Sequence, residues 1–233
     1  MTRVTIVIPV WNDRGTLTRC LESIERRTFR DVDVVVVDDG SEPPTEARGT
    51  SGEVRIRWIR QSHGGAPSAR NRGARETTSE FVMFCDADIE LSPQALSRMV
   101  AALDAHPEAS YAYSSFRFGW KKFQSFPFNA DRLRRMPYIH TTALIRRAHF
   151  PGFDESLTRF QDWDLWLTML ERGHVGIHIP EVLFTIQNTR GTMSRWIPSF
   201  VYRLPWKFRR VREYDAAAEI VHQKHRLPGR LTG

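Results

Sequence analysis

The first half of the chain alternates short apolar runs with amphipathic stretches, and this alternation restricts the fold more than any other feature. Residues 4–10 and 34–37 are runs of mainly β-branched residues, as in strands that are covered on both faces. Residues 15–27, which lie between them, place leucine and isoleucine side chains on one stripe of a helix. Strands that alternate with helices predict stacked βαβ units, and therefore an α/β fold with a mostly parallel sheet flanked by helices.

The same patterns predict the remaining elements. Strands are expected at residues 56–59, 81–85, 111–115, 140–144 and 175–179, and helices at 67–76, 93–106 and 161–172. Ser92 is expected to cap the helix that follows it, with Pro93 in the first helical position. Gly173 is expected to end the helix that precedes it.

Length and composition fit one globular domain with a basic balance of charge. The 233 residues suffice to bury a core without disulfides or a structural metal. The only cysteines, Cys20 and Cys85, lie far apart in the sequence, which excludes a disulfide framework and a cysteine zinc site. The net charge of +7 favours an anionic partner. No targeting segment or membrane span is visible at the N-terminus, so a cytoplasmic location is expected.

Acidic residues follow two of the expected strands. Asp38 and Asp39 follow one, and Asp86 and Asp88 follow another. Ligands of open α/β sheets bind outside the carboxyl ends of the strands, although an Asp-Asp-Gly-Ser run can equally well start a turn. Two carboxylates one residue apart repel each other unless a cation or several donors compensate them. Their spacing therefore predicts a site for Mg²⁺ or Mn²⁺, with substrate phosphates completing the shell.

A third acidic pair, Asp162 and Asp164, opens the helix expected at residues 161–172. Helix N-termini favour acidic residues, which is one sufficient explanation for both. The alternative is a general base that accepts a proton from an attacking hydroxyl.

Five stretches in this order resemble the family 2 glycosyltransferases, inverting enzymes with the GT-A fold. They are residues 7–12, 38–41, 64–73, 86–88 (the DxD motif) and 161–166. The likeness covers about residues 2–194 and implies a Rossmann-like mostly parallel central sheet. It also implies a domain at 1–194, with a nucleotide-sugar half at 1–110, an acceptor and catalytic half at 111–194, and a basic aromatic tail at 195–233.

The resemblance assigns roles to residues of this sequence. Asp39 would pair with a uracil base, Arg70 would lie near the diphosphate, and Asp88 would be the main cation ligand. Asp86 would contact the ribose or a metal-bound water, and Asp162 would be the catalytic base. The residues expected to form the nucleotide site are Pro9, Val10, Trp11, Asn12, Asp38, Asp39, Arg70, Asp86 and Ala87.

This chain departs from the family pattern in places. Trp11 stands where the family usually has Tyr, and Gln161 replaces the usual Glu. Thr189 stands where a His often completes the metal site, so Asn188 or water is the alternative ligand.

The acceptor site is predicted less specifically. Residues 116–135 combine aromatic and basic side chains, which is typical either of a surface loop with some core aromatics or of an acceptor-binding flap. The candidate acceptor residues are Trp120, His140, Trp163 and Asp164. Residues 195–212 interleave basic and aromatic residues and predict either a packed tail or a peripheral contact with the inner face of the membrane, which would favour a lipid-linked acceptor.

The leading hypothesis is a metal-assisted inverting glycosyltransferase that moves a sugar from a nucleotide-sugar, with UDP-sugars favoured, to a glycan or lipid-linked hydroxyl in cell-surface polysaccharide synthesis. A polyisoprenyl-phosphate acceptor is the alternative within this class. A non-enzymatic binder of an anionic polymer would have no use for three acidic clusters, and no nucleic-acid partner is expected. A nucleotidyltransferase would need a glycine-rich phosphate loop near the first strand, which this chain lacks.

Overall fold

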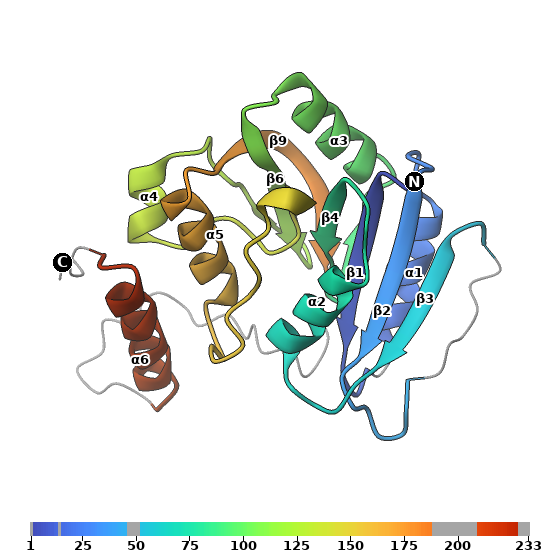
Figure 1. Cartoon of the computed structure of the whole chain (residues 1–233), viewed down its shortest axis with the longest axis horizontal. Helices are drawn as coiled ribbons and strands as arrows, with labels where there is room; N and C mark the ends of the chain where they lie inside the picture. The colour runs from blue at the N-terminus through green and yellow to red at the C-terminus, as the bar shows by residue number, and fades with distance from the viewer. Residues whose placement is uncertain (1, 14, 46–51, 188–208, 228–233) are drawn as a thin grey trace.

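In the part of the chain that the structure describes, a sheet of nine strands forms the centre of the fold (Figure 1). The computed structural model describes residues 2–13, 15–45, 52–187 and 209–227, with side chains after residue 208 described from Tyr214 on. The strand order is β3-β2-β1-β4-β8-β6-β9-β5, and β7 pairs with β6. Strands β3, β2, β1 and β4 are parallel to one another, and the other half of the sheet mixes parallel and antiparallel pairs.

The elements have the following bounds. The strands are β1 Val4–Val10, β2 Val32–Asp38, β3 Arg55–Arg60, β4 Phe81–Phe84, β5 Ile89–Leu91, β6 Ala109–Phe118, β7 Lys121–Phe123, β8 Leu144–Arg146 and β9 Val175–Ile186. The helices are α1 Thr16–Glu25, α2 Ala66–Arg75, α3 Ala95–Ala105, α4 Ala130–Arg135, α5 Gln161–Glu171 and α6 Arg209–Lys224, with a 3₁₀ turn at Arg147–His149.

Successive residues of β1 face two different hydrophobic cores. Ile6 and Ile8 pack in the core that α1 and α3 cover, whereas Val7 packs in the core that α2 and α5 cover. This alternation follows from the two-residue period of a strand. Gly73 of α2 lies over Val7, and a Cβ at this glycine would come within 2.3 Å of Val7 Cγ1. The absence of a side chain there lets α2 lie close to the sheet.

The elements predicted in the first half are present, and their parallel pairing is confirmed. The cap predicted at Ser92 is wrong, because α3 begins at Ala95 and no side chain caps it. The backbone N–H of Ser92 instead donates to the carbonyl of Leu183 in β9. The strand predicted at 140–144 is also wrong apart from Leu144, since the amide of Thr142 bonds locally to the His140 ring.

Several elements were not predicted. Strands β5 and β7 span three residues each, too few for a periodic signal. Helix α6 falls within the predicted tail (Figure 1). Its Val221 side chain packs into the same core as the buried side chains of α5. Among the helices of the described residues, none combines the length and hydropathy that crossing a membrane requires.

Candidate active site

The carboxyl ends of β1, β2 and β4 meet at one edge of the sheet, because these strands are parallel. Asp39 follows β2 and donates its backbone N–H to the carbonyl of Val10 at the end of β1. Asp86 is the second residue after β4. Cys85, which precedes it, donates its N–H to the carbonyl of Val7 in β1. The first two predicted acidic clusters therefore lie at the same edge.

Asp39 organises the loop that leads into α2. Its carboxylate accepts the backbone amides of Gly64 and Gly65 at 2.9 and 2.8 Å and the side-chain amide of Gln61 at 2.8 Å. The Nδ1 atom of His63 lies 2.9 Å from the same carboxylate, which is 2% exposed. Pairing with a nucleobase, as the resemblance implies, would require one of these donors to give way.

Asp38 has a similar part in the neighbouring loop, where its oxygens accept the backbone amides of Ser41 at 3.0 Å and Thr45 at 3.2 Å. Asn12 joins this loop to the end of β1: its N–H donates to Ser41 Oγ, and its Oδ1 accepts from Glu42 N. The acids that the sequence indicated are thus also the groups that hold the loops around them.

Trp11 provides an exposed aromatic surface at this edge. Its ring is stacked on that of His63 with centroids 4.3 Å apart, and the residue is 54% exposed. Pro9 and Val10 are buried within β1, so they support the edge without presenting side chains to it. Of the four predicted nucleotide-site residues at residues 9–12, Trp11 and Asn12, which follow β1, are therefore the exposed ones.

Arg70 links the DxD motif to the start of α5. Its Nη2 donates to Asp86 Oδ1 at 2.6 Å, and its Nη1 donates to Gln161 Oε1 at 2.9 Å. Burial by itself would raise the pKa of Asp86, but the charge and hydrogen bond of Arg70 outweigh it and lower that pKa. The neutral Gln161 thus has a defined function as an acceptor for this arginine.

Asp88 lies in an acidic environment. Burial, together with the charges of Asp86 and Asp13, raises its pKa to about 6 against the opposing effects of a backbone hydrogen bond and Arg70. Sequence analysis missed Asp13, which accepts the amides of Gly15 and the next residues at the start of α1. The signal that could have found it is an Asp shortly before a predicted helix.

The donor set fits Mg²⁺ or Mn²⁺. Asp86 and Asp88 supply carboxylates from one short turn, and these cations need only one or two carboxylates when substrate phosphates complete the shell. Within the described part of the chain, three or more His, Cys, Asp or Glu side chains do not gather into a metal-binding group. Asn188 and Thr189, the predicted additional ligands, lie outside the described residues.

Asp162 and His140 lie within electrostatic range of each other and of Arg70. Burial raises the pKa of Asp162, and the charges of His140 and Arg70 and the Trp163 amide oppose the rise. Burial lowers the pKa of His140, while the charges of Asp86 and Asp162 oppose that change. His140 therefore interacts with both carboxylates, and perturbed titrating groups of this kind concentrate at functional sites.

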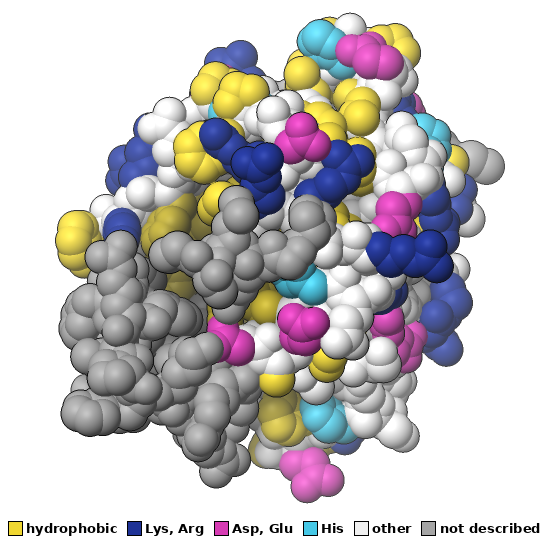
Figure 2. All heavy atoms as spheres, turned by 90° about the vertical axis from the view of Figure 1, so that its left-hand side faces the viewer, with side chains coloured by type: hydrophobic (Ala, Val, Ile, Leu, Met, Phe, Trp, Pro, Cys, Tyr) yellow, Lys and Arg dark blue, Asp and Glu magenta, His cyan; other side chains and the backbone are white. Residues whose placement is uncertain are grey.

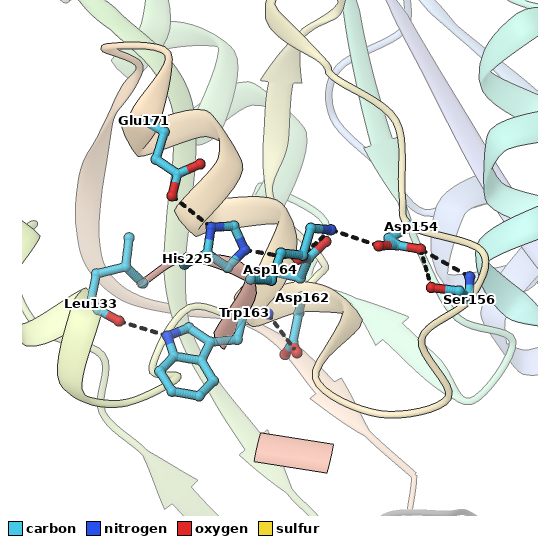
Figure 3. A network of polar contacts seen from close by, with 9 residues as sticks. Leu133, Asp154, Ser156, Asp162, Trp163, Asp164, Glu171 and His225 are labelled. Atoms are coloured by element: carbon cyan, nitrogen blue, oxygen red, sulfur yellow. Dashed lines mark hydrogen bonds and ion pairs between the residues drawn. The ribbon is translucent and has the colours of Figure 1, made fainter. Parts of the chain in front are cut away.

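The other predicted acceptor residues lie elsewhere. Trp163 is buried and donates its ring N–H to the carbonyl of Leu133 at 2.6 Å. Asp164 is 2% exposed and faces α6, as Figure 3 shows. Trp120 lies in the turn between β6 and β7 and is 93% exposed. The structure thus brings His140 to the carboxylates and places Trp163 and Asp164 in the packing around α5.

A network of charged side chains fastens α6 to α5 (Figure 3). Asp164 Oδ1 lies 2.8 Å from His225 Nε2 and 2.7 Å from Lys224 Nζ. The other ring nitrogen of His225 lies 2.8 Å from Glu171 Oε1, and Lys224 also pairs with Asp154 at 2.6 Å. This network reaches α5 two residues after Asp162, and nothing in the sequence pattern indicated it.

The sequence profile described as "Glycosyl transferase family 2" matches residues 5–161, which include the edge of the sheet described above. The chain belongs to glycosyl transferase family 2. The match contains Asp39, Arg70 and the DxD motif, and Asp162 follows directly after it.

Relatives of this chain include bacterial proteins of several descriptions. The O-antigen biosynthesis protein RfbC of Myxococcus xanthus is 30% identical over 196 residues, which are 78% of this chain and 15% of RfbC. The uncharacterized glycosyltransferase YibD of Escherichia coli is 30% identical over 138 residues, which are 57% of this chain and 40% of YibD. The chain therefore spans less than half the length of these relatives.

Solved structures with the same fold include two that were determined with a nucleotide-sugar bound. TarS 1–349 of S. aureus in complex with UDP-GlcNAc gives a TM-score of 0.68 at 18% identity, covering 84% of this chain and 62% of that one. The mannosyltransferase PcManGT of Pyrobaculum calidifontis in complex with GDP-Man and Mn²⁺ gives 0.63 at 21% identity, covering 81% and 58%. The GT-A fold implied by the five motifs is therefore confirmed.

Proposed function

We propose that this family 2 glycosyltransferase transfers a sugar from a nucleotide-sugar, with UDP-sugars favoured, to a hydroxyl of a glycan or lipid-linked acceptor. The observation that carries the proposal is the bridge from Asp86 through Arg70 to Gln161. It joins the edge of the sheet, where ligands of α/β folds bind, to the residue that precedes Asp162. Donor and base would then lie on opposite sides of one buried arginine.

The donor half of the site suits a nucleoside diphosphate. TarS was solved with UDP-GlcNAc and PcManGT with GDP-Man and Mn²⁺, which supports a nucleotide-sugar donor and a divalent cation here. Asp88 and Asp86 would hold the cation, which when bound neutralises charge on the leaving diphosphate. Arg70 adds a permanent positive charge beside them, and the exposed Trp11 ring offers a stacking surface to a base.

Asp162 is the proposed catalytic base. A carboxylate with a raised pKa accepts a proton more readily at neutral pH than an ordinary Asp does. Removing the proton from an acceptor hydroxyl as it attacks the anomeric carbon gives a single displacement with inversion. His140, which interacts electrostatically with both Asp86 and Asp162, would orient groups between donor and acceptor.

The acceptor is proposed at the level of its class. RfbC is described as an O-antigen biosynthesis protein, which supports a role in cell-surface polysaccharide synthesis. Trp120 projects from the β6–β7 turn, where an exposed ring can stack on a sugar. The proposed peripheral membrane contact at the cytoplasmic face depends on residues 195–212, of which 195–208 lie outside the described part of the chain.

The described residues on the face drawn in Figure 2 do not support a binder of anionic polymers. Among them, acidic and histidine side chains lie between separate groups of Lys and Arg rather than beside one continuous cationic surface.

The test measures the change in melting temperature with UDP-, GDP-, dTDP- and CMP-sugars, each with Mn²⁺ and with EDTA. We expect one nucleotide class, with UDP favoured, to raise Tm in Mn²⁺ and to do so less in EDTA. The Asp162→Asn variant should keep this response while losing transfer activity. The proposal fails if no nucleotide-sugar changes Tm, and the role of Asp162 fails if the variant transfers sugar at the normal rate.

A further inference from the structure

Gln187, directly after β9, has a buried side chain without a hydrogen-bond partner. The residue is 7% exposed, and within the described part of the chain neither its Oε1 nor its Nε2 atom has a hydrogen-bond partner. A buried carboxamide without partners is destabilising, and such groups in folded proteins generally have a partner. The unpaired amide therefore indicates that Gln187 meets a ligand.

The register of the sheet places Gln187 beside the DxD motif. Strands β5 and β9 are antiparallel, with Ile89 opposite Ile186. The N–H of Gln187 donates to the carbonyl of Asp88 at 2.8 Å, which extends this register by one residue. Residues directly opposite each other in an antiparallel pair project their side chains on the same face. The carboxamide of Gln187 and the carboxylate of Asp88 are thus neighbours.

The chemistry of a carboxamide narrows the choice of ligand. Its oxygen can accept a hydrogen bond or bind a hard cation, and its nitrogen can only donate. A cation bound to a diphosphate offers both partners side by side, namely a positive centre for Oε1 and anionic oxygens for Nε2. A free cation would satisfy the oxygen alone, and an isolated phosphate would satisfy the nitrogen alone.

We propose that Gln187 binds the cation–diphosphate unit of the donor, with Oε1 on the cation beside Asp88 and Nε2 donating to a diphosphate oxygen. This inference rests on the proposed function and adds a specific ligand to it. Gln187 would then add a carboxamide oxygen to the carboxylates of Asp86 and Asp88 at the cation site. The increase in nucleotide affinity that the metal causes therefore depends on Gln187.

Calorimetry with UDP as the probe tests the proposal. The dissociation constant is measured in Mn²⁺ and in EDTA, and their ratio gives the metal-dependent gain. Gln187→Met keeps the length of the side chain and removes both polar atoms. Because even indirect partners of metal ligands change metal affinity by about 10–100-fold, we expect the gain to fall at least about tenfold. The affinity in EDTA should change little by comparison.

A stability measurement separates ligand binding from a structural role. Gln187→Met removes a polar group that has no partner, so the Tm of the ligand-free variant should be equal to or above that of the parent protein. Thr185→Val is the matched control, because Thr185 lies two residues earlier on β9, opposite Glu90. This control should keep the metal-dependent gain.

The outcomes distinguish the two proposals. If the parent protein shows no metal-dependent gain for UDP or another nucleoside diphosphate, the proposed cation-assisted function fails and the role of Gln187 fails with it. If the parent shows the gain and Gln187→Met retains it, only the role of Gln187 is overturned. If Gln187→Met does not fold, Gln187→Glu replaces it: Mn²⁺ alone should bind more tightly, while the gain for UDP falls through charge repulsion. An unchanged gain in that variant also overturns the proposal.

Discussion

Replacing His225 with alanine tests how firmly α6 is fastened to α5. The imidazole bridges Asp164 and Glu171, and its side chain is 2% exposed. Glu171 is 55% exposed, so solvent screens that contact and it contributes little. The side chain of Asp164 is 3% exposed, and its contact with His225 is therefore the part that matters for stability.

The expected loss of stability follows from this environment. Removing one partner of a buried ion pair costs about 3–5 kcal/mol when the other charge is left alone. Lys224 still lies 2.7 Å from Asp164, so the remaining charge keeps one partner. The loss then approaches that of a hydrogen bond to a charged group, about 2 kcal/mol. For a chain of this length that corresponds to a decrease in Tm of about 4–8 °C.

The pH dependence separates the charge of His225 from its packing. Burial lowers the pKa of His225, but its contacts with Asp164 and Glu171 outweigh burial and raise that pKa above the ordinary 6.5. The stabilising contribution is therefore complete below pH 6.5 and declines as the pH rises through the folded-state pKa. The difference in unfolding free energy between the parent protein and His225→Ala should accordingly shrink at high pH, leaving the packing contribution.

The assay is thermal and urea unfolding from pH 5.5 to 9, with the exposed Gln223→Ala on α6 as the control. The control should change Tm by less than about 1 °C, as is usual for surface substitutions. An equally small change in His225→Ala, or a difference between variant and parent that grows with pH, would refute the reasoning.

Two further substitutions test the site and the packing of α2. Arg70→Lys keeps the charge, but a lysine cannot donate to both Asp86 and Gln161 from one planar group. We therefore expect kcat to fall by about 10²–10³, as for the loss of a transition-state donor. The measurement is product formation at saturating donor. Near-normal kcat in this variant would contradict the bridging role. Gly73→Ala would push a methyl group against Val7, at 2.3 Å from Cγ1, and should destabilise the fold by about 1–3 kcal/mol in urea unfolding. The control is Ala74→Ser on the same helix, because Gly173→Thr would add strain from the positive φ at Gly173. Equal stabilities of Gly73→Ala and Ala74→Ser would count against close packing of α2 on the sheet.

Local patterns were sufficient to predict the nucleotide half of the fold. Strands β1, β2 and β4 are mostly apolar, and Asp39 and Asp86 follow β2 and β4 within two residues. Parallel strands bring their carboxyl ends to one edge, so the meeting of Asp39 and Asp86 could be predicted once the strands were recognised. The five motifs added the GT-A fold, which the family match and the solved structures bear out.

The remaining features depend on pairings between distant segments. Gln187 comes to lie beside Asp88 only through the register of β5 and β9, and β5 is too short to be seen in the sequence. His225 and Asp164 meet only because α6 packs on α5, across 61 positions of the chain. Sequence periodicity records which face of an element is buried but not which element covers it. The tertiary structure therefore decided which polar side chains are buried together, whereas the sequence by itself determined the strands, the helices and the edge where the acids gather.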